Sequence, residues 1–136
     1  MPEPAGSADP TACGSNNRIA AYTFGYKIGE EERQAESNLR ARFFQGALAK
    51  SRDLETRLRL CASLTDGGAL LDLETAQSEI IEAEAIGGLG DTGNMAFILG
   101  RAKAVLNSLG ATATDTRDLE REHALHARVA HDMVSH

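Results

Sequence analysis

Hydrophobic residues recur every three or four positions over most of this chain, which is the pattern of helices that bury one face. The pattern is strict over 94–109, where it is formed by Met95, Ile98, Leu99, Ala102, Val105, Leu106 and Leu109. Over 69–86 it is formed by Leu70, Leu73, Ala76, Ile80 and Ala83. We expect Gly110 to end one helix and Asp115 or Thr116 to cap a last helix that runs to the C-terminus.

The segment 30–64 shows the same period, but its length leaves two interpretations open. Its apolar stripe consists of Leu39, Phe43, Ala47, Leu54, Leu58 and Cys61, widened by Phe44 and Leu48. A single helix would be about 50 Å long at 1.5 Å per residue, which would favour a dimer of the coiled-coil type. Alternatively, Lys50 interrupts the stripe and Ser51-Arg52-Asp53 caps a second helix.

The first 29 residues are less regular. Residues 1–17 are rich in Pro, Gly, Ser and Asn and predict a disordered arm. Within 19–28 aromatic and small residues alternate as in a strand, yet helical spacing also fits, and no partner strand is evident in the chain. We expect a short helix or a docked extended segment there, or else a strand that pairs between two copies. The sequence as a whole predicts an all-α bundle of about four helices, with residues 18–136 forming a single domain.

The formal net charge of −6 is distributed unevenly along the 136 residues. Residues 18–64 carry nine basic and six acidic side chains, whereas 65–92 carry seven acidic side chains and no Lys or Arg. Two such segments placed antiparallel would neutralise each other along their contact. The apolar stripe of 69–86 predicts that Asp72, Glu79 and Glu82 lie on the opposite, outward face, where they would bind a basic partner.

Composition narrows the class of protein. With 42% hydrophobic and 25% charged residues, the chain is typical of a globular domain, and it has no apolar run of the roughly 20 residues that a membrane span needs. The N-terminal residues lack the pattern of a secretory signal, and two cysteines are too few for a disulfide framework. We therefore expect a cytoplasmic protein with Cys61 as a buried free thiol. The negative charge argues against nucleic-acid binding.

Residues 88–93 read GLGDTG and match the G-x-G-x-x-G fingerprint of dinucleotide-binding folds. That site requires a buried strand directly before the glycines, with the pyrophosphate at the N-terminus of the following helix. Here Glu79, Glu82 and Glu84 precede the motif in a helical pattern, and carboxylates in this place would repel a phosphate. The motif is interpreted as a connection between two helices.

All four histidines lie in the last 14 residues. The Glu120-x-x-His123 spacing places two ligands on one helix face, as in the carboxylate-bridged di-iron bundles of ferritin-like proteins. Together with Glu122 and His126, this pair could hold Zn²⁺ or Ni²⁺. In the simpler interpretation, His126 is a half-buried interface residue whose ring N–H is accepted by Glu122 one turn away.

No set of side chains here is typical of catalysis, and no cofactor is expected. The sequence favours a non-enzymatic helical interaction or regulatory protein of the adaptor type, acting through protein–protein contacts as a homodimer that uses 30–64 and the last helix. One alternative is a metal-binding helical bundle that uses the C-terminal Glu/His cluster. Another is an acidic inhibitor, similar in action to an antitoxin, that masks a basic partner.

Overall fold

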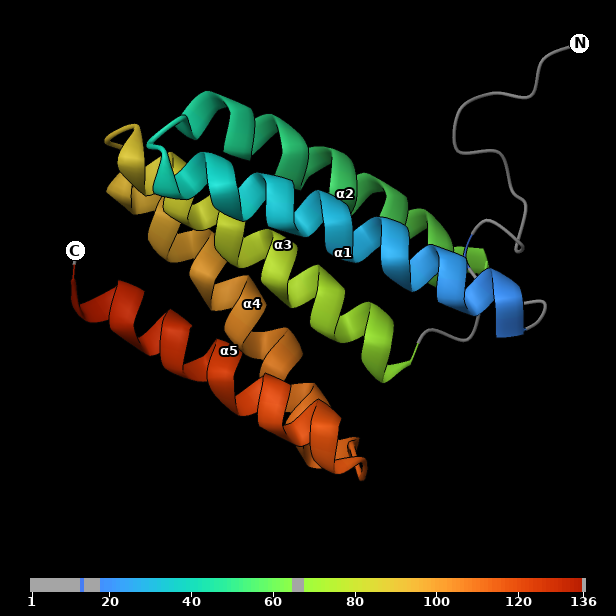
Figure 1. Cartoon of the computed structure of the whole chain (residues 1–136). Coiled ribbons are helices and arrows are strands. Elements are labelled where there is room, and N and C mark those ends of the chain that lie inside the picture. Colours follow the sequence, from blue (N-terminus) through green and yellow to red (C-terminus); the bar gives the residue numbers. More distant parts are fainter. Residues whose placement is uncertain (1–12, 14–17, 65–67, 136) are drawn as a thin grey trace, which may run out of the picture.

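In the computed structural model every described secondary-structure element of appreciable length is an α-helix (Figure 1). The structure describes residue 13 and residues 18–64 and 68–135. The helices are α1 (Arg18–Arg40), α2 (Phe44–Leu64), α3 (Ala69–Gly88), α4 (Thr92–Thr112) and α5 (Thr116–Val134). The all-α prediction is confirmed, with five helices in place of about four. The predicted disordered arm lies outside the described residues except at position 13.

The segment 19–28, for which a strand or an extended segment was considered, forms the first part of α1. Phe24 and Ile28 are buried there against α2 and α3, so helical spacing and not alternation decides its structure. The intermolecular strand is therefore wrong.

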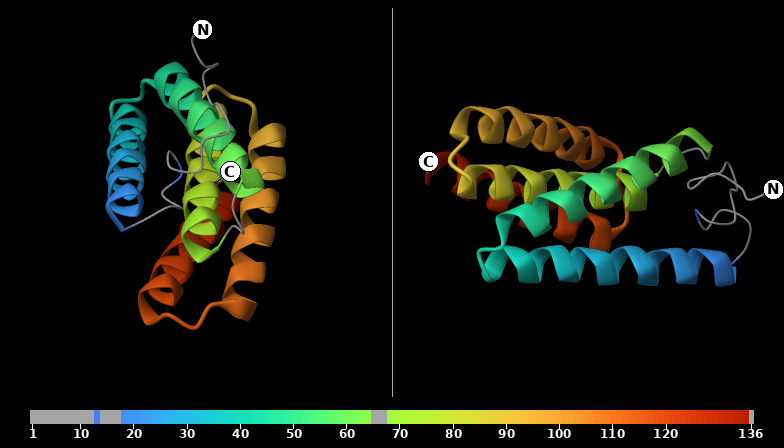
Figure 2. Two further views of the ribbon diagram at one scale, coloured as in Figure 1. Left: turned by 90° about the vertical axis from the view of Figure 1, so that its right-hand side faces the viewer. Right: turned by 90° about the horizontal axis from the view of Figure 1, so that it is seen from above.

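Helix α3 is the centre of the bundle and packs against the other four helices. Helices α1 and α2 lie on one side of it and α4 and α5 on the other (Figures 1 and 2). The largest apolar cluster joins α3, α4 and α5, and the 94–109 stripe contributes Met95, Ile98, Leu99, Ala102, Leu106 and Leu109 to it. This placement buries most of α3 after its first turn, while Leu70 and Asp72 stay exposed.

The segment 30–64 is two helices, and they separate at 41–43 and not at Ser51. Arg42 has φ 61°, the left-handed conformation that turns a chain sharply, and its guanidinium lies 5.4 Å from the centre of the Phe44 ring. Ser51 lies in the middle of α2, fully buried, and its hydroxyl donates to the Leu48 carbonyl at 2.9 Å. A single long helix that would dimerise as a coiled coil is therefore excluded.

The glycine-rich motif is the connection between α3 and α4, as predicted, and a helix precedes it. Gly90 adopts φ 98°, which favours glycine, and Asp91 caps α4 by accepting from the Asn94 backbone N–H at 3.1 Å. Gly88 is needed for close packing, because a Cβ there would lie 2.5 Å from Cε1 of Phe44. The turn between α3 and α4 therefore rests on the turn between α1 and α2.

Residues 113–115 connect α4 to α5. Helix α4 continues through Gly110 to Thr112, so that glycine does not end the helix. Its missing side chain makes room for Glu122, whose Oε1 would lie 3.1 Å from a Cβ at position 110. Asp115 caps α5, as expected, by accepting from the Arg117 backbone N–H at 2.8 Å.

Cys61 is buried, as predicted, but it is not a free thiol. It forms a disulfide with Cys13, 48 residues earlier in the chain. The bond ties position 13 to the apolar cluster formed by α1, α2 and the start of α3. Counting cysteines missed this bond, because two cysteines fit a single cross-link as well as two thiols.

Candidate functional site

Glu74, Glu79 and Glu82 of α3 are buried inside the protein, which corrects the prediction of an outward acidic face. Glu79 and Glu82 are 5% and 7% exposed, and Asp72 alone of the three predicted partner-binding residues is solvent-exposed. Of the apolar stripe predicted for α3, Leu73, Ala76, Ile80 and Ala83 are buried, whereas Leu70 is 48% exposed. However, α3 is surrounded by four helices, so its polar positions also meet protein. These positions form two polar seams.

The first seam joins α2, α3 and α4. We call it the α2–α3–α4 seam; its members are Arg52, Glu55, Glu79, Glu82 and Arg101. Arg101 Nε donates to Glu79 at 2.9 Å, and Arg52 Nε donates to Glu82 at 3.1 Å. This pairing of a basic residue of α2 with an acidic residue of α3 agrees with the complementary charge predicted for the two segments.

Glu55 has the weakest polar contacts of the three carboxyl groups in this seam. Its Oε1 lies 3.5 Å from Arg101, while Oε2 has no donor within hydrogen-bonding distance. Burial raises its pKa from the ordinary 4.5 to about 8, and the neighbouring carboxylate of Glu82 adds to the effect through hydrogen bonding and repulsion. At neutral pH, Glu55 therefore keeps a proton that it donates to Glu82.

The second seam joins α1, α3 and α5. We call it the α1–α3–α5 seam; its members are Glu32, Glu36, Glu74, Gln77, Glu84, Arg121, Arg128 and Asp132. Arg128 donates to both oxygens of Glu36 at 2.7 Å and, through Nε, to Glu84 at 2.8 Å. Burial opposes the charge of Arg128, but these two carboxylates raise its pKa above the ordinary value. One guanidinium thus bridges α1, α3 and α5.

Asp132 lies beside this bridge and is buried. Burial raises its pKa to about 8, helped by the adjoining carboxylate of Glu84. Burial also works against ionisation of Glu84, yet hydrogen bonds from Arg128 and Asp132 leave its pKa lowered. The pair therefore holds one proton on Asp132 and one negative charge on Glu84.

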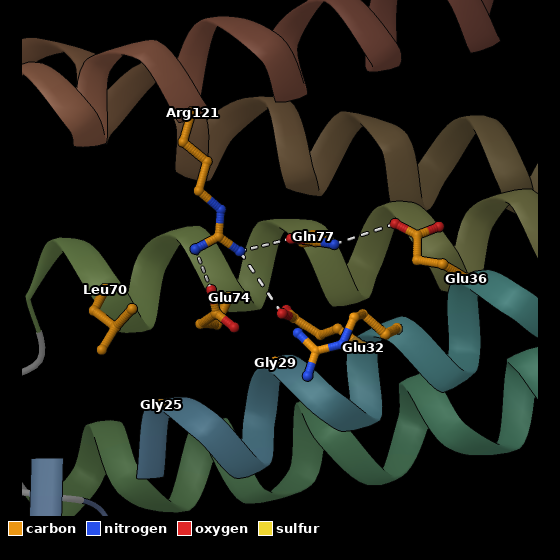
Figure 3. A pocket seen from close by; sticks show the side chains of 9 residues that line it. Gly25, Gly29, Glu32, Glu36, Leu70, Glu74, Gln77 and Arg121 are labelled. Carbon is orange, nitrogen blue, oxygen red and sulfur yellow. Dashed lines mark hydrogen bonds and ion pairs between the residues drawn. The ribbon is translucent and has the colours of Figure 1, made fainter. Parts of the chain in front are cut away.

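A groove of about 360 Å³ opens beside the other end of the α1–α3–α5 seam (Figure 3). Its lining comes from α1 (Gly25, Gly29, Glu32, Arg33, Glu36), α3 (Leu70, Glu74, Gln77) and α5 (Arg121). These α1 and α3 positions recur at helical spacing, so each helix presents one face to the groove. We call this space the acidic groove, because three of its nine lining residues are carboxylates and two are basic.

Arg121 reaches from α5 across α3 into the acidic groove (Figure 3). Its guanidinium contacts Glu74 and donates to Gln77 at 2.6 Å, and Gln77 in turn donates to Glu36 at 3.2 Å. Glu32 receives much less, because its nearest approach to Arg121 is 3.8 Å and its Oε2 has no donor. Burial raises the pKa of Glu32 to about 10, and Glu74 adds to this through hydrogen bonding and repulsion.

The C-terminal cluster of Glu and His side chains consists of contacts between Glu122 and two histidines. Glu122 is buried, with its carboxylate 2.9 Å from His126 Nε2 and 3.4 Å from His123 Nε2, whereas Glu120 is exposed. His126 is half-buried, as predicted. Throughout the described part of the chain, no group of three or more His, Cys, Asp or Glu side chains is placed to hold a metal ion.

Figure 1 shows that the α1–α2 turn, the α3–α4 turn and the end of α5 lie at one end of the bundle. Large apolar side chains in or near these segments are exposed. We call this surface the apolar end; its members are Phe43 (58% exposed), Leu89 (45%), Phe97 (66%), Met133 (42%) and Val134 (85%). Arg40, Arg42 and Asp91, which are all exposed, border it and supply both signs of charge.

Comparison of the chain with protein-family models, with characterised protein sequences and with solved structures finds no match. Among the described residues, no helix combines the length and the hydropathy that a membrane span requires.

Sequence reasoning missed the acidic groove and the α1–α3–α5 seam, and of the α2–α3–α4 seam it predicted only the complementary charge of the two segments. The signal for the groove was present in α1, where Gly25, Gly29, Glu32 and Glu36 share one helix face. Two glycines followed by two glutamates on a single face indicate a hollow with acidic walls. Arg121 and Arg128 carried no such signal, because only the packing of α5 on α3 brings them to these carboxylates.

Proposed function

We propose that this protein is a non-enzymatic helical interaction protein that works as a homodimer, with the apolar end as its contact surface. The observation that carries the proposal is the exposure of two phenylalanines, Phe43 and Phe97, at the same end of the bundle. Aromatic residues are enriched in protein interfaces, and several large apolar side chains exposed at one end of a molecule favour an interaction site there.

A second copy of this chain is the occupant that the border of the apolar end favours. A two-fold interface brings the same surface of both copies together, so its charges must complement themselves. Arg40 and Arg42 follow α1 into its turn, and Asp91 lies in the α3–α4 turn that rests against it. In a two-fold pair, the basic border of one copy can face Asp91 of the other, while the phenylalanines meet in the centre.

The test is the mass of the particle between 1 and 100 μM protein, measured by light scattering after gel filtration. We expect wild type to be dimeric at the upper end of this range. A Phe43→Ser/Phe97→Ser variant should dissociate, because burial of each phenylalanine contributes about 1.5–3 kcal/mol, and each 1.4 kcal/mol changes the dissociation constant about tenfold.

Tyr26→Ser is the matched control for this experiment. Tyr26 is as exposed as Phe43, but it lies in α1 about 21 Å of helix rise from the apolar end. Its replacement should leave the dimer unchanged. A wild-type protein that is monomeric at 100 μM, or a dimer that both variants weaken equally, would refute the proposed interface.

We also propose that the protein works where disulfides persist. The cytoplasmic location expected from the sequence conflicts with the Cys13–Cys61 bond, because cytosolic thiols are kept reduced. Alkylation of free thiols in intact cells, before lysis, should leave both cysteines unmodified. Full modification of both cysteines would show that the protein is in a reducing compartment and would contradict this proposal.

Two alternatives from the sequence are not favoured. A metal-binding bundle would need further ligands beside Glu122, His123 and His126, and none is placed there among the described residues. An acidic inhibitor that uses Asp72, Glu79 and Glu82 would have to bind through side chains of which two are buried and paired with arginines.

A further inference from the structure

We propose that the acidic groove binds a small organic cation, a primary alkylammonium whose charged head lies against Glu32 and whose methylene chain lies along Gly25 and Gly29 toward Leu70. This inference is independent of the apolar end. It rests on one oxygen of Glu32 that lacks a donor, on the shape of the groove walls, and on the groove volume.

Side chains of this protein pair closely with Glu36 and Glu74 in the groove, whereas Glu32 has only the longer contact of 3.8 Å with Arg121. Arg128 and Gln77 donate to Glu36, and Arg121 contacts Glu74. Glu32 is 5% exposed, lines the groove, and has one oxygen without any donor. Burying a carboxylate oxygen without a donor is unfavourable in free energy, so one further positive group with N–H donors would stabilise Glu32.

Without such a ligand, a proton shared between Glu32 and Glu74 takes its place, as the raised pKa of Glu32 indicates. An ammonium ion supplies a full charge and three N–H donors to the same oxygens. Binding therefore exchanges one cation for another: the ammonium enters, and the proton leaves Glu32 for the solvent. The charged groups around Glu32 are Glu74 on α3, Arg121 on α5 and Glu36 on α1, and Arg33 on α1 also lines the groove.

The walls suit a short aliphatic chain. Gly25 leaves the backbone of α1 bare, because a Cβ there would have no heavy atom within 4 Å, whereas at Gly29 the Arg33 guanidinium lies 3.5 Å from the position of a Cβ. Leu70, which is 48% exposed, forms the apolar part of the α3 wall. The volume of about 360 Å³ lies at the small end of the range for ligand pockets. An inorganic cation is disfavoured, because the described residues offer no set of three ligands.

The experiment uses n-hexylamine as the probe and n-hexanol as its neutral counterpart, with binding to the full chain followed by NMR chemical shifts and calorimetry at pH 7. We expect a dissociation constant of roughly 0.1–1 mM for the amine, in the range open to so small a ligand. Calorimetry in buffers of different ionisation enthalpy should show release of about one proton per amine bound, and binding should strengthen from pH 6 to pH 9.

Glu32→Gln should weaken amine binding at least tenfold, since it removes both the charge and the exchangeable proton. Glu55→Gln, the matched change in the α2–α3–α4 seam, should alter it less than twofold. Gly25→Leu should also weaken binding at least tenfold, because its side chain enters the groove. This variant keeps every carboxylate, so it remains informative if Glu32→Gln fails to fold. Equal binding of hexanol, absence of proton release, or unchanged binding by Gly25→Leu would overturn the proposal.

Discussion

Cys13→Ser is expected to lower the free energy of unfolding by about 4 kcal/mol. The disulfide closes a loop across 48 positions, and the chain-entropy model gives about this value for such a loop because the cross-link restricts the unfolded chain. Cys13 is half-buried and precedes the first helix, so the substitution removes the cross-link and leaves the helices intact. Urea unfolding followed by circular dichroism measures the effect.

Wild-type protein unfolded in the presence of a strong reductant is the control for this variant. Reduction breaks the same bond without a change of residue, so both samples should lose the same free energy. A loss below about 1 kcal/mol in both would contradict the expected role of the bond. A large loss in the variant alone would assign the effect to the serine and not to the cross-link.

The stability of the bundle is expected to fall as the pH rises from 5 to 8. Glu55 and Asp132, with pKa values raised to about 8, and Glu32, raised to about 10, bind protons more tightly in the folded protein than in the unfolded chain. A group of this kind stabilises the fold fully below its unfolded pKa and loses that contribution as the pH rises through its folded pKa. Each proton held in this way makes stability fall by about 1.4 kcal/mol per pH unit.

One retained proton therefore corresponds to a loss of about 4 kcal/mol between pH 5 and pH 8. Urea unfolding at a series of pH values measures the slope. Glu55→Gln should make it shallower, because glutamine keeps a donor toward Glu82 and does not ionise. Glu30→Gln, an exposed change in α1, should leave the slope as it is. Stability that is constant or rises over this range would show that the buried carboxyl groups are ionised.

The parts of this fold that could be predicted from the sequence are those set by local pattern. The stripe of 94–109 gave the buried face of α4, and Asp115 marked the start of α5, because periodicity and capping depend on residues a few positions apart. The turn at 41–43 could not be found in this way. It depends on a left-handed conformation at Arg42, a residue type with little preference for it, and neither glycine nor proline marks the position.

Helix α3 shows which kind of burial the periodic pattern of a sequence does not predict. Its stripe correctly gave one buried face, and the usual inference places the opposite face in water. In a five-helix bundle one helix can be surrounded, and then its polar face needs partners that lie far away in the sequence. Arg101 and Arg128 supply these partners from 22 and 44 positions beyond the glutamates that they bind. The excess of acidic residues in 65–92 is thus mostly internal charge, balanced by arginines and by shared protons.

A pH titration of the side-chain carboxyl carbons by NMR tests whether buried carboxyl groups hold protons between the helices. Three carboxyl groups, those of Glu32, Glu55 and Asp132, should remain protonated at pH 7 in the folded protein and titrate above it. If every glutamate and aspartate of the folded chain titrates below pH 6, the bundle does not share protons between its helices and the account is wrong.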